Sequence, residues 1–258
     1  MASPSPDGLQ TLLDERFIRY NQPDFILEDP ISIPHRFSRK EDIEISGFLI
    51  ALLAWGRRPM IIRSGERLLA IMEDQPYEWV MGKRPISTPF VHRTFNGEDL
   101  AAMRVALRKV YQQEGGLETI FTQGIKPSDP DVYGGLIHAR TCLTTDTDFP
   151  ARSHKHLANP AKGSAAKRIN MFLRWMVRND GMGVDFGLWK GISPSQLICP
   201  LDVHTATVAR RLGLLTRKQN DWKAASELTA SLRSFCPEDP VRYDFSLFGM
   251  GAYEGKPD

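Results

Sequence analysis

A lysine and an aspartate in the second half of the chain could act as a catalytic pair. Lys167 follows a Lys-Gly-Ser turn at 162–164, and Asp202 lies in the segment Pro-Leu-Asp-Val-His-Thr at 200–205. A lysine amine can attack an electrophilic sugar carbon and form a Schiff base when desolvation or nearby cations lower its pKa. An aspartate opposite it can stabilise an oxocarbenium-like transition state, as carboxylates do in glycoside cleavage. The two residue types therefore suit the removal of a base from its deoxyribose, although spacing alone does not establish the pairing.

Basic residues gather in the region that contains this pair. The segment 151–217 holds eleven Lys or Arg and three Asp, a net charge of +8 in a chain whose total is +2. A basic region on a nearly neutral protein is typical of a polyanion-binding surface. A solvated basic face without a partner is the alternative interpretation.

The turn before Lys167 is a candidate phosphate site. A Gly-Ser turn that opens a helix leaves backbone N–H groups unpaired at the positive end of the helix dipole. We therefore predict that DNA is bound by three turn residues and two arginines of the following helix, namely Lys162, Gly163, Ser164, Arg168 and Arg174. Lys162 is also a rival to Lys167 as the nucleophile.

One face of the same predicted helix is polar. Its members, at positions i, i+3, i+4, i+7 and i+11, are Lys167, Asn170, Met171, Arg174 and Arg178. Residues with this spacing share a face, and here they lie opposite an apolar stripe. The face could border a binding cleft, or it could be an ordinary solvated surface.

Other candidates are arginines, a histidine and tryptophans. Arg57 and Arg58 follow a predicted helix and could hold phosphate. His204, two residues after Asp202, is a further candidate DNA contact, although a lone histidine can equally be structural. Asp202 is also suited to cap the helix that begins beside it. Three tryptophans could stack on an extruded base or could belong to the core: Trp55, Trp175 and Trp189.

No cofactor and no metal is expected. The three cysteines are scattered and form no CxxC pair, which disfavours a structural zinc site and a four-cysteine iron–sulfur cluster. The segments His-Lys-His at 154–156 and Asp-Thr-Asp at 146–148 each lack a full ligand set.

These side chains require a helical scaffold. Apolar periodicity and capping residues predict helices over 9–20, 38–55, 59–74, 99–113, 132–142, 164–178, 202–212, 222–235 and 239–248, with Ser38 as a cap, and no strand. We expect an all-α protein with a flexible N-terminus over 1–8 and a single two-lobed domain over 9–258, with a cleft between the lobes. No apolar run is long enough to span a bilayer and no secretion signal is evident, so a cytoplasmic protein is expected.

Four motifs carry a resemblance that covers nearly the whole chain. They are EISGFLIALLAWGRR at 44–58, KGSAAKRINMFLRWMVR at 162–178, PLDVHT at 200–205 and DPVRYDFSLFGMG at 239–251. The chain resembles an uncharacterised, mainly bacterial family described only as a domain of unknown function. More distantly, it is similar to the helix-hairpin-helix (HhH-GPD) DNA glycosylases, and most to their archaeal 8-oxoguanine subgroup. In that superfamily a catalytic lysine and a later catalytic aspartate occupy positions that match Lys167 and Asp202.

The resemblance implies a DNA glycosylase of base excision repair. It would act as a monomer on double-stranded DNA near the nucleoid, remove an oxidised purine and cleave the abasic site through a lysine Schiff base. The sequence departs from the pattern because NPAKGS at 159–164 replaces the glycine-rich hairpin and the cluster cysteines of endonuclease III are missing. Two alternatives remain: a non-catalytic nucleic-acid-binding protein on the same scaffold, and a hydrolase of nucleosides or modified RNA bases.

Overall fold

The computed structural model describes residues 6–83, 89–145 and 148–254. The chain forms two compact units. Unit 1 comprises residues 1–25, 130–132 and 160–258, and unit 2 comprises residues 26–129 and 133–159. The described part of each unit is mainly helical, which confirms the all-α class. Of the N-terminus expected to be flexible over 1–8, residues 1–5 lie outside the described ranges and residues 6–8 form the start of the first helix.

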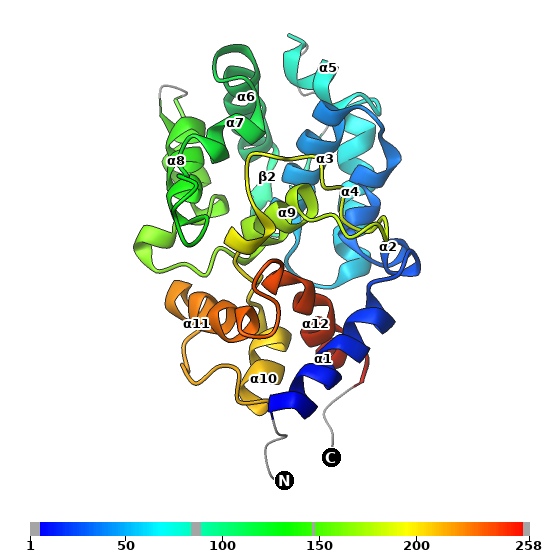
Figure 1. The fold of residues 1–258 in the computed structure, drawn as a ribbon. Helices are drawn as coiled ribbons and strands as arrows, with labels where there is room; N and C mark the ends of the chain where they lie inside the picture. The colour runs from blue at the N-terminus through cyan, green and yellow to red at the C-terminus, as the bar shows by residue number, and fades with distance from the viewer. Residues whose placement is uncertain (1–5, 84–88, 146–147, 255–258) are drawn as a thin grey trace. The chain divides into compact units, whose positions relative to one another are not determined.

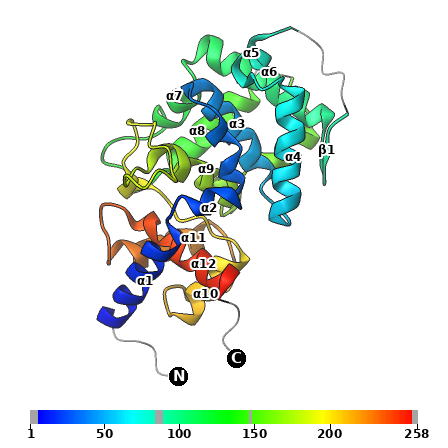
Figure 2. The same ribbon diagram turned by 90° about the vertical axis from the view of Figure 1, so that its right-hand side faces the viewer.

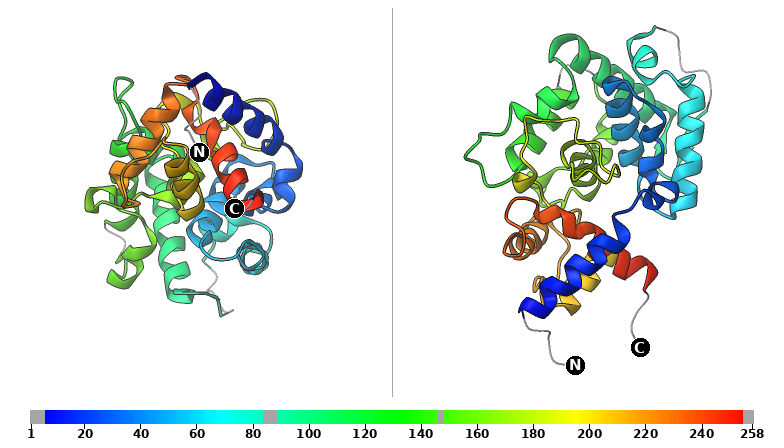
Figure 3. Two further views of the ribbon diagram at one scale, coloured as in Figure 1. Left: turned by 90° about the horizontal axis from the view of Figure 1, so that it is seen from below. Right: turned by 45° about the vertical axis from the view of Figure 1, so that its right-hand side comes forward.

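Unit 1 contains five α-helices in its described residues. These are α1 (Pro6–Tyr20), α9 (Lys167–Val177), α10 (Val203–Arg211), α11 (Trp222–Arg233) and α12 (Asp244–Tyr253), with 3₁₀ turns at Pro160–Lys162, Pro194–Gln196 and Pro240–Tyr243. Figures 1 and 3 show α1 beside α12, and α10 also packs on α12. The contact is close because Gly249 of α12 has no side chain where the Tyr20 ring lies.

Helix α9 lies in the core of unit 1. Its predicted apolar stripe is buried, as seen at Phe172, Leu173 and Met176. The chain after α9 is held against its carboxyl end, since the N–H groups of Phe186 and Trp189 donate to carbonyls of α9 at 2.8 and 2.9 Å. This packing fixes one long face of α9 and leaves its first turn next to Asp202.

Unit 2 is built around α3 (Lys40–Leu53), which is buried over nearly its whole length. The other helices are α4 (Arg58–Ile71), α5 (Pro76–Met81), α6 (Gly97–Gln113), α7 (Leu117–Thr122) and α8 (Tyr133–Thr144), with 3₁₀ turns at Pro30–Ser32, Pro34–Arg36 and Ala151–His156. A short helix, α2 (Asp24–Leu27), crosses the boundary between the units. Figure 2 shows α4 along one side of α3.

Two local predictions in unit 2 are wrong. A short hairpin pairs β1 (Val91–His92) with β2 (Phe95–Asn96), where no strand was expected, because two-residue strands carry no recognisable period-2 pattern. Ser38 does not cap α3, whose N-cap is Arg39 without a side-chain hydrogen bond. In the described part of the chain, no helix is both long enough and apolar enough to cross a membrane.

Candidate functional site

Lys167 and Asp202 lie together at the starts of two helices of unit 1. Lys167 is the first residue of α9, and Asp202 is the N-cap of α10, where its side chain accepts a hydrogen bond from the N–H of Thr205 at 2.9 Å. The predicted capping role of Asp202 is therefore confirmed. The Lys167 Nζ atom lies 3.9 Å from Asp202 Oδ2, and the two side chains are 29% and 24% exposed. The pair thus combines ionic contact with access to solvent.

The backbone before Lys167 sets where α9 begins. Ala166 adopts a left-handed conformation with φ of 50°, and its N–H donates to Ser164 Oγ at 3.2 Å. A non-glycine residue in this region costs about 1–2 kcal/mol, so the surrounding packing must enforce it. The helix therefore starts at Lys167, three residues later than predicted, which places the lysine in its first turn.

Asp244 is a buried carboxyl close to this pair. It begins α12, is 5% exposed, and accepts a hydrogen bond from Arg174 at 2.6 Å. Burial raises the pKa of Asp244 to about 6, with a further rise from the charge of Asp202 and opposing effects from Arg174 and Lys167. A carboxyl with a pKa near neutrality can exchange a proton under physiological conditions.

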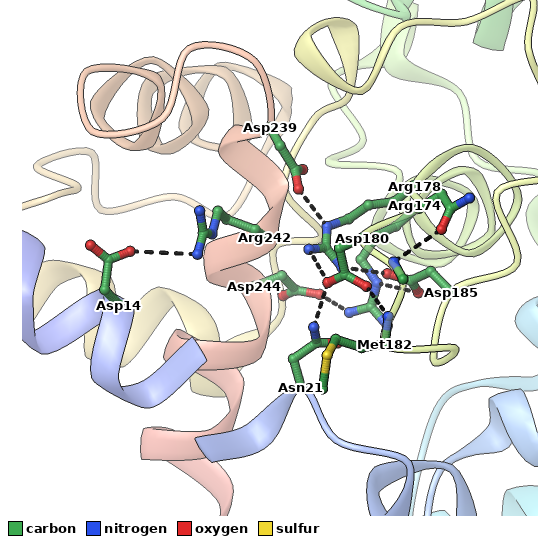
Figure 4. Close-up of polar contacts among 12 residues, drawn as sticks. Asp14, Asn21, Arg174, Arg178, Asp180, Met182, Asp185, Asp239, Arg242 and Asp244 are labelled. Carbon is green, nitrogen blue, oxygen red and sulfur yellow. Dashed lines mark hydrogen bonds and ion pairs between the residues drawn. The ribbon is translucent and has the colours of Figure 1, made fainter. Parts of the chain in front are cut away.

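Two arginines of the polar face of α9 are buried in an ionic network. Arg174 and Arg178 are 4% and 1% exposed, and Figure 4 shows carboxylates from two other stretches of chain, 180–185 and 239–244, around them. The contacts of Arg174 are to Asp185 at 3.2 Å and Asp244 at 2.6 Å. Those of Arg178 are to Asp180 at 2.7 Å, Asp185 at 3.0 Å and Asp239 at 2.8 Å.

This network corrects two interpretations of the sequence. Arg174 was predicted to bind DNA, but its guanidinium is buried and already occupied by carboxylates, so it cannot contact phosphate in this structure. The alternative of a solvated polar face is also wrong, since Asn170 and Met171 are buried as well. The polar face of α9 instead packs against other parts of unit 1.

The predicted phosphate turn is partly used by internal hydrogen bonds. Lys162, Gly163 and Ser164 are exposed, and Gly163 has a φ of 84° that suits glycine. However, the Gly163 N–H donates to Pro160 at 2.8 Å, and the Gly163 carbonyl accepts from Trp222 at 3.1 Å. With the Ala166 N–H also bonded, two of the N–H groups expected to hold phosphate are not available. The exposed Lys162 side chain remains a candidate contact.

The tryptophan predictions divide between the two units. Trp175 and Trp189 are 0% and 1% exposed in unit 1, and Trp189 packs edge-on against Phe172. Both rings belong to the core, so the prediction that they stack on a base is wrong for this structure. Trp55, in unit 2, is partly exposed, and the Arg93 guanidinium lies 4.6 Å from its ring centre.

The remaining predicted contacts lie in both units. In unit 2, Arg57 is the exposed N-cap of α4 and Arg58 is its half-buried first residue. In unit 1, Arg168 is half-buried, and burial lowers the pKa of its guanidinium. His204 is exposed in the first turn of α10, beside Gly251.

The histidine and aspartate segments considered as ligand sets have other surroundings. His154 contacts Arg140 at 3.0 Å, and His156 faces Asp99 at 3.3 Å. Asp146 lies outside the described residues. Within the ranges that the structure describes, no group of three or more His, Cys, Asp or Glu side chains is arranged to hold a metal ion.

Sequence reasoning missed Asp244 and Asp185. Asp244 lies in the last of the four quoted motifs, where an aspartate precedes an apolar run, and that position was a signal that it begins a helix. Asp185 lies in an irregular glycine-rich segment without periodicity. Its role depends on contacts with α9 that only the fold reveals.

Comparison with known proteins places the chain in a family. No curated protein and no solved structure matches the chain. A family model described as "Protein of unknown function (DUF2400)" matches residues 29–253, which include Lys167, Asp202 and Asp244. That span covers most of the chain and both units, and so the chain belongs to the DUF2400 family.

Proposed function

We propose that this protein is a DNA glycosylase of base excision repair, with Lys167 as the nucleophile and Asp202 as the residue that stabilises the transition state. The observation that carries the proposal is the 3.9 Å separation between Lys167 Nζ and Asp202 Oδ2 within unit 1. Both side chains are partly exposed, so a substrate can reach them. The distant similarity of the motifs around them to HhH-GPD glycosylases supports the same roles.

The chemistry follows from these two groups. The neutral Lys167 amine attacks C1′ of the damaged nucleotide, a new C–N bond forms, and the glycosidic bond breaks with its electron pair leaving on the base. The base takes up a proton as it departs. The carboxylate of Asp202 stabilises the positive charge that develops on the sugar. Opening of the sugar ring then gives a Schiff base on Lys167, and β-elimination would cleave the strand on its 3′ side.

Asp244 adds a buried carboxyl beside this pair. Burial raises its pKa to about 6, the charge of Asp202 raises it further, and the charges of Arg174 and Lys167 lower it. Arg174 holds this carboxyl at 2.6 Å and fixes its position. The proposed substrate is an oxidised purine in duplex DNA, extruded from the stack at a cost of a few kcal/mol.

Borohydride trapping tests the proposal directly. The protein is incubated with a duplex that contains 8-oxoguanine or an abasic site, reduced, and examined for a covalent adduct on a denaturing gel. The adduct should be lost in Lys167→Gln and kept in Lys162→Gln, which is a matched control because Lys162 is an exposed lysine nearby in sequence. An adduct that survives in Lys167→Gln would refute the assignment of the nucleophile.

Asp202→Asn separates capping from catalysis. Asparagine caps helices about as well as aspartate, so folding and DNA affinity should be retained while base release is lost. If base release persists in this variant, Asp202 has only its structural role. Salt-dependent DNA binding without adduct or base release, over a panel of lesions, would instead favour a non-catalytic binding protein.

A further inference from the structure

A row of arginines lies on α4 in unit 2, in the part of the fold without Lys167 and Asp202. Arg57, Arg63 and Arg67 are exposed and are separated by six and four residues, with Met60 between the first two. Arg63 and Arg67 are one turn apart and share one side of the helix, whereas Arg57, the N-cap, lies about 120° around the axis from Arg63. Met60 lies between the directions of Arg57 and Arg63 and is 54% exposed. We refer to Arg57, Arg63 and Arg67 as the α4 row.

The hairpin beside α4 adds a fourth arginine and orders the third. Figure 2 shows β1 next to α4, and Arg67 donates a hydrogen bond to the Val91 carbonyl there. The Arg67 guanidinium lies 5.2 Å from the ring centre of Phe90, and that of Arg93 lies 4.6 Å from Trp55. Guanidinium groups held against aromatic rings lose less side-chain entropy when they bind a ligand, and they still offer donors at their edges.

The positive charge of this surface is not neutralised. Among the residues that the structure describes, no carboxylate forms an ion pair within 4.0 Å with the α4 row or with Arg93. By contrast, Arg36 is paired with Glu66. The buried His92 lies within reach of the same charges, and its pKa is lowered first by burial and further by Arg93 and Arg67.

We propose that the α4 row, together with Arg93, binds the phosphate backbone of duplex DNA. This inference deepens the proposed function and rests on it for the choice of DNA as the polyanion. From Arg57 to Arg67 the helix extends about 15 Å, a length over which duplex DNA carries about nine phosphate charges. Guanidinium groups bind phosphate through paired hydrogen bonds, and exposed Met60 and Val91 offer apolar contacts to sugars.

The test is the salt dependence of binding to a short undamaged duplex, measured by fluorescence anisotropy between about 50 and 200 mM salt. Each phosphate contact contributes a slope of about −0.9 in log affinity against log salt. The double variant Arg63→Gln/Arg67→Gln removes two contacts and should therefore make the slope shallower by about 1.8. When the salt is raised fourfold, from about 50 to 200 mM, the double variant should lose about 12-fold less affinity than the wild type loses. Arg63→Gln alone should reduce the slope by about 0.9, and it leaves the Arg67 contact with the hairpin in place.

Controls separate this surface from the catalytic proposal. Arg36→Gln removes an arginine of unit 2 that is paired with Glu66, and it should leave the slope unchanged. Lys167→Gln should keep most of the slope while losing the borohydride adduct, so failure of the chemistry does not hide the result. Equal slopes for the wild type, Arg63→Gln and the double variant would overturn the inference, as would a wild type that shows no salt-dependent binding.

Discussion

The buried carboxylate of Asp185 offers the sharpest test of what holds unit 1 together. Its side chain is fully buried and accepts hydrogen bonds from Arg174 at 3.2 Å and from Arg178 at 3.0 Å. Asp185→Asn keeps the shape but removes the charge, which leaves two buried guanidinium groups with less compensation. Removing one partner of a buried ion pair costs about 3–5 kcal/mol. At about 2–4 °C per kcal/mol for a chain of this size, Tm should fall by roughly 6–20 °C.

The assay is urea and thermal unfolding of wild type and variants, followed by circular dichroism. Asp180→Asn is an intermediate case, because the Asp180 side chain is 20% exposed and forms an ion pair with Arg178 but not with Arg174. This substitution should lower the unfolding free energy by less than Asp185→Asn does. Glu15→Gln is the control, since Glu15 is 62% exposed in a weak 3.5 Å pair and its change should stay below about 0.5 kcal/mol. A loss under about 1 kcal/mol for Asp185→Asn would refute the view that this network stabilises unit 1.

Three further outcomes are expected. Burial raises the pKa of Asp244 from 3.8 in the unfolded chain to about 6 in the folded protein. The stability that its protonated form contributes is therefore fully present below pH 4 and is lost as the pH rises through 6. Between pH 4 and pH 6 the difference in unfolding free energy between wild type and Asp244→Asn should change by roughly 3 kcal/mol. Gly249→Ala would place a Cβ atom 2.1 Å from the Tyr20 ring and should lower the unfolding free energy by about 1–3 kcal/mol, whereas Gly97→Ala meets no atom within 4 Å and should have little effect. Asp202→Ala should lose about 1 kcal/mol of stability through the missing cap, while Asp202→Asn should not, as chemical denaturation can show.

The helical class and most helix positions could be predicted from the sequence because apolar spacing follows the turns of a helix. The stripe on α9 is an example, since Phe172 and Leu173 are buried as expected. The exact start of α9 could not be predicted, because the left-handed conformation of Ala166 depends on tertiary packing. The β1–β2 hairpin was missed because its strands are too short to show alternation.

The candidate site was harder to predict for a physical reason. Periodicity identifies which residues share a helix face, but it does not identify what faces them. Arg174 and Arg178 have spacing typical of a solvated or ligand-binding surface, yet carboxylates from distant segments cover them. The proximity of Lys167 and Asp202, by contrast, could be anticipated only through resemblance to a known family, because 35 residues separate them in sequence.

The interrupted path of the chain through unit 1 has a consequence for synthesis. Helix α1 packs against α12, but the whole of unit 2 is made between them. At about 5–20 residues per second, α12 leaves the ribosome roughly 10–45 s after α1. During that time Leu13 and Phe17 of α1, which are buried in the finished protein, lack the helix that covers them. The order of emergence thus requires unit 2 to be complete before unit 1 can close, and a nascent chain stalled short of α12 should be selectively sensitive to protease at α1.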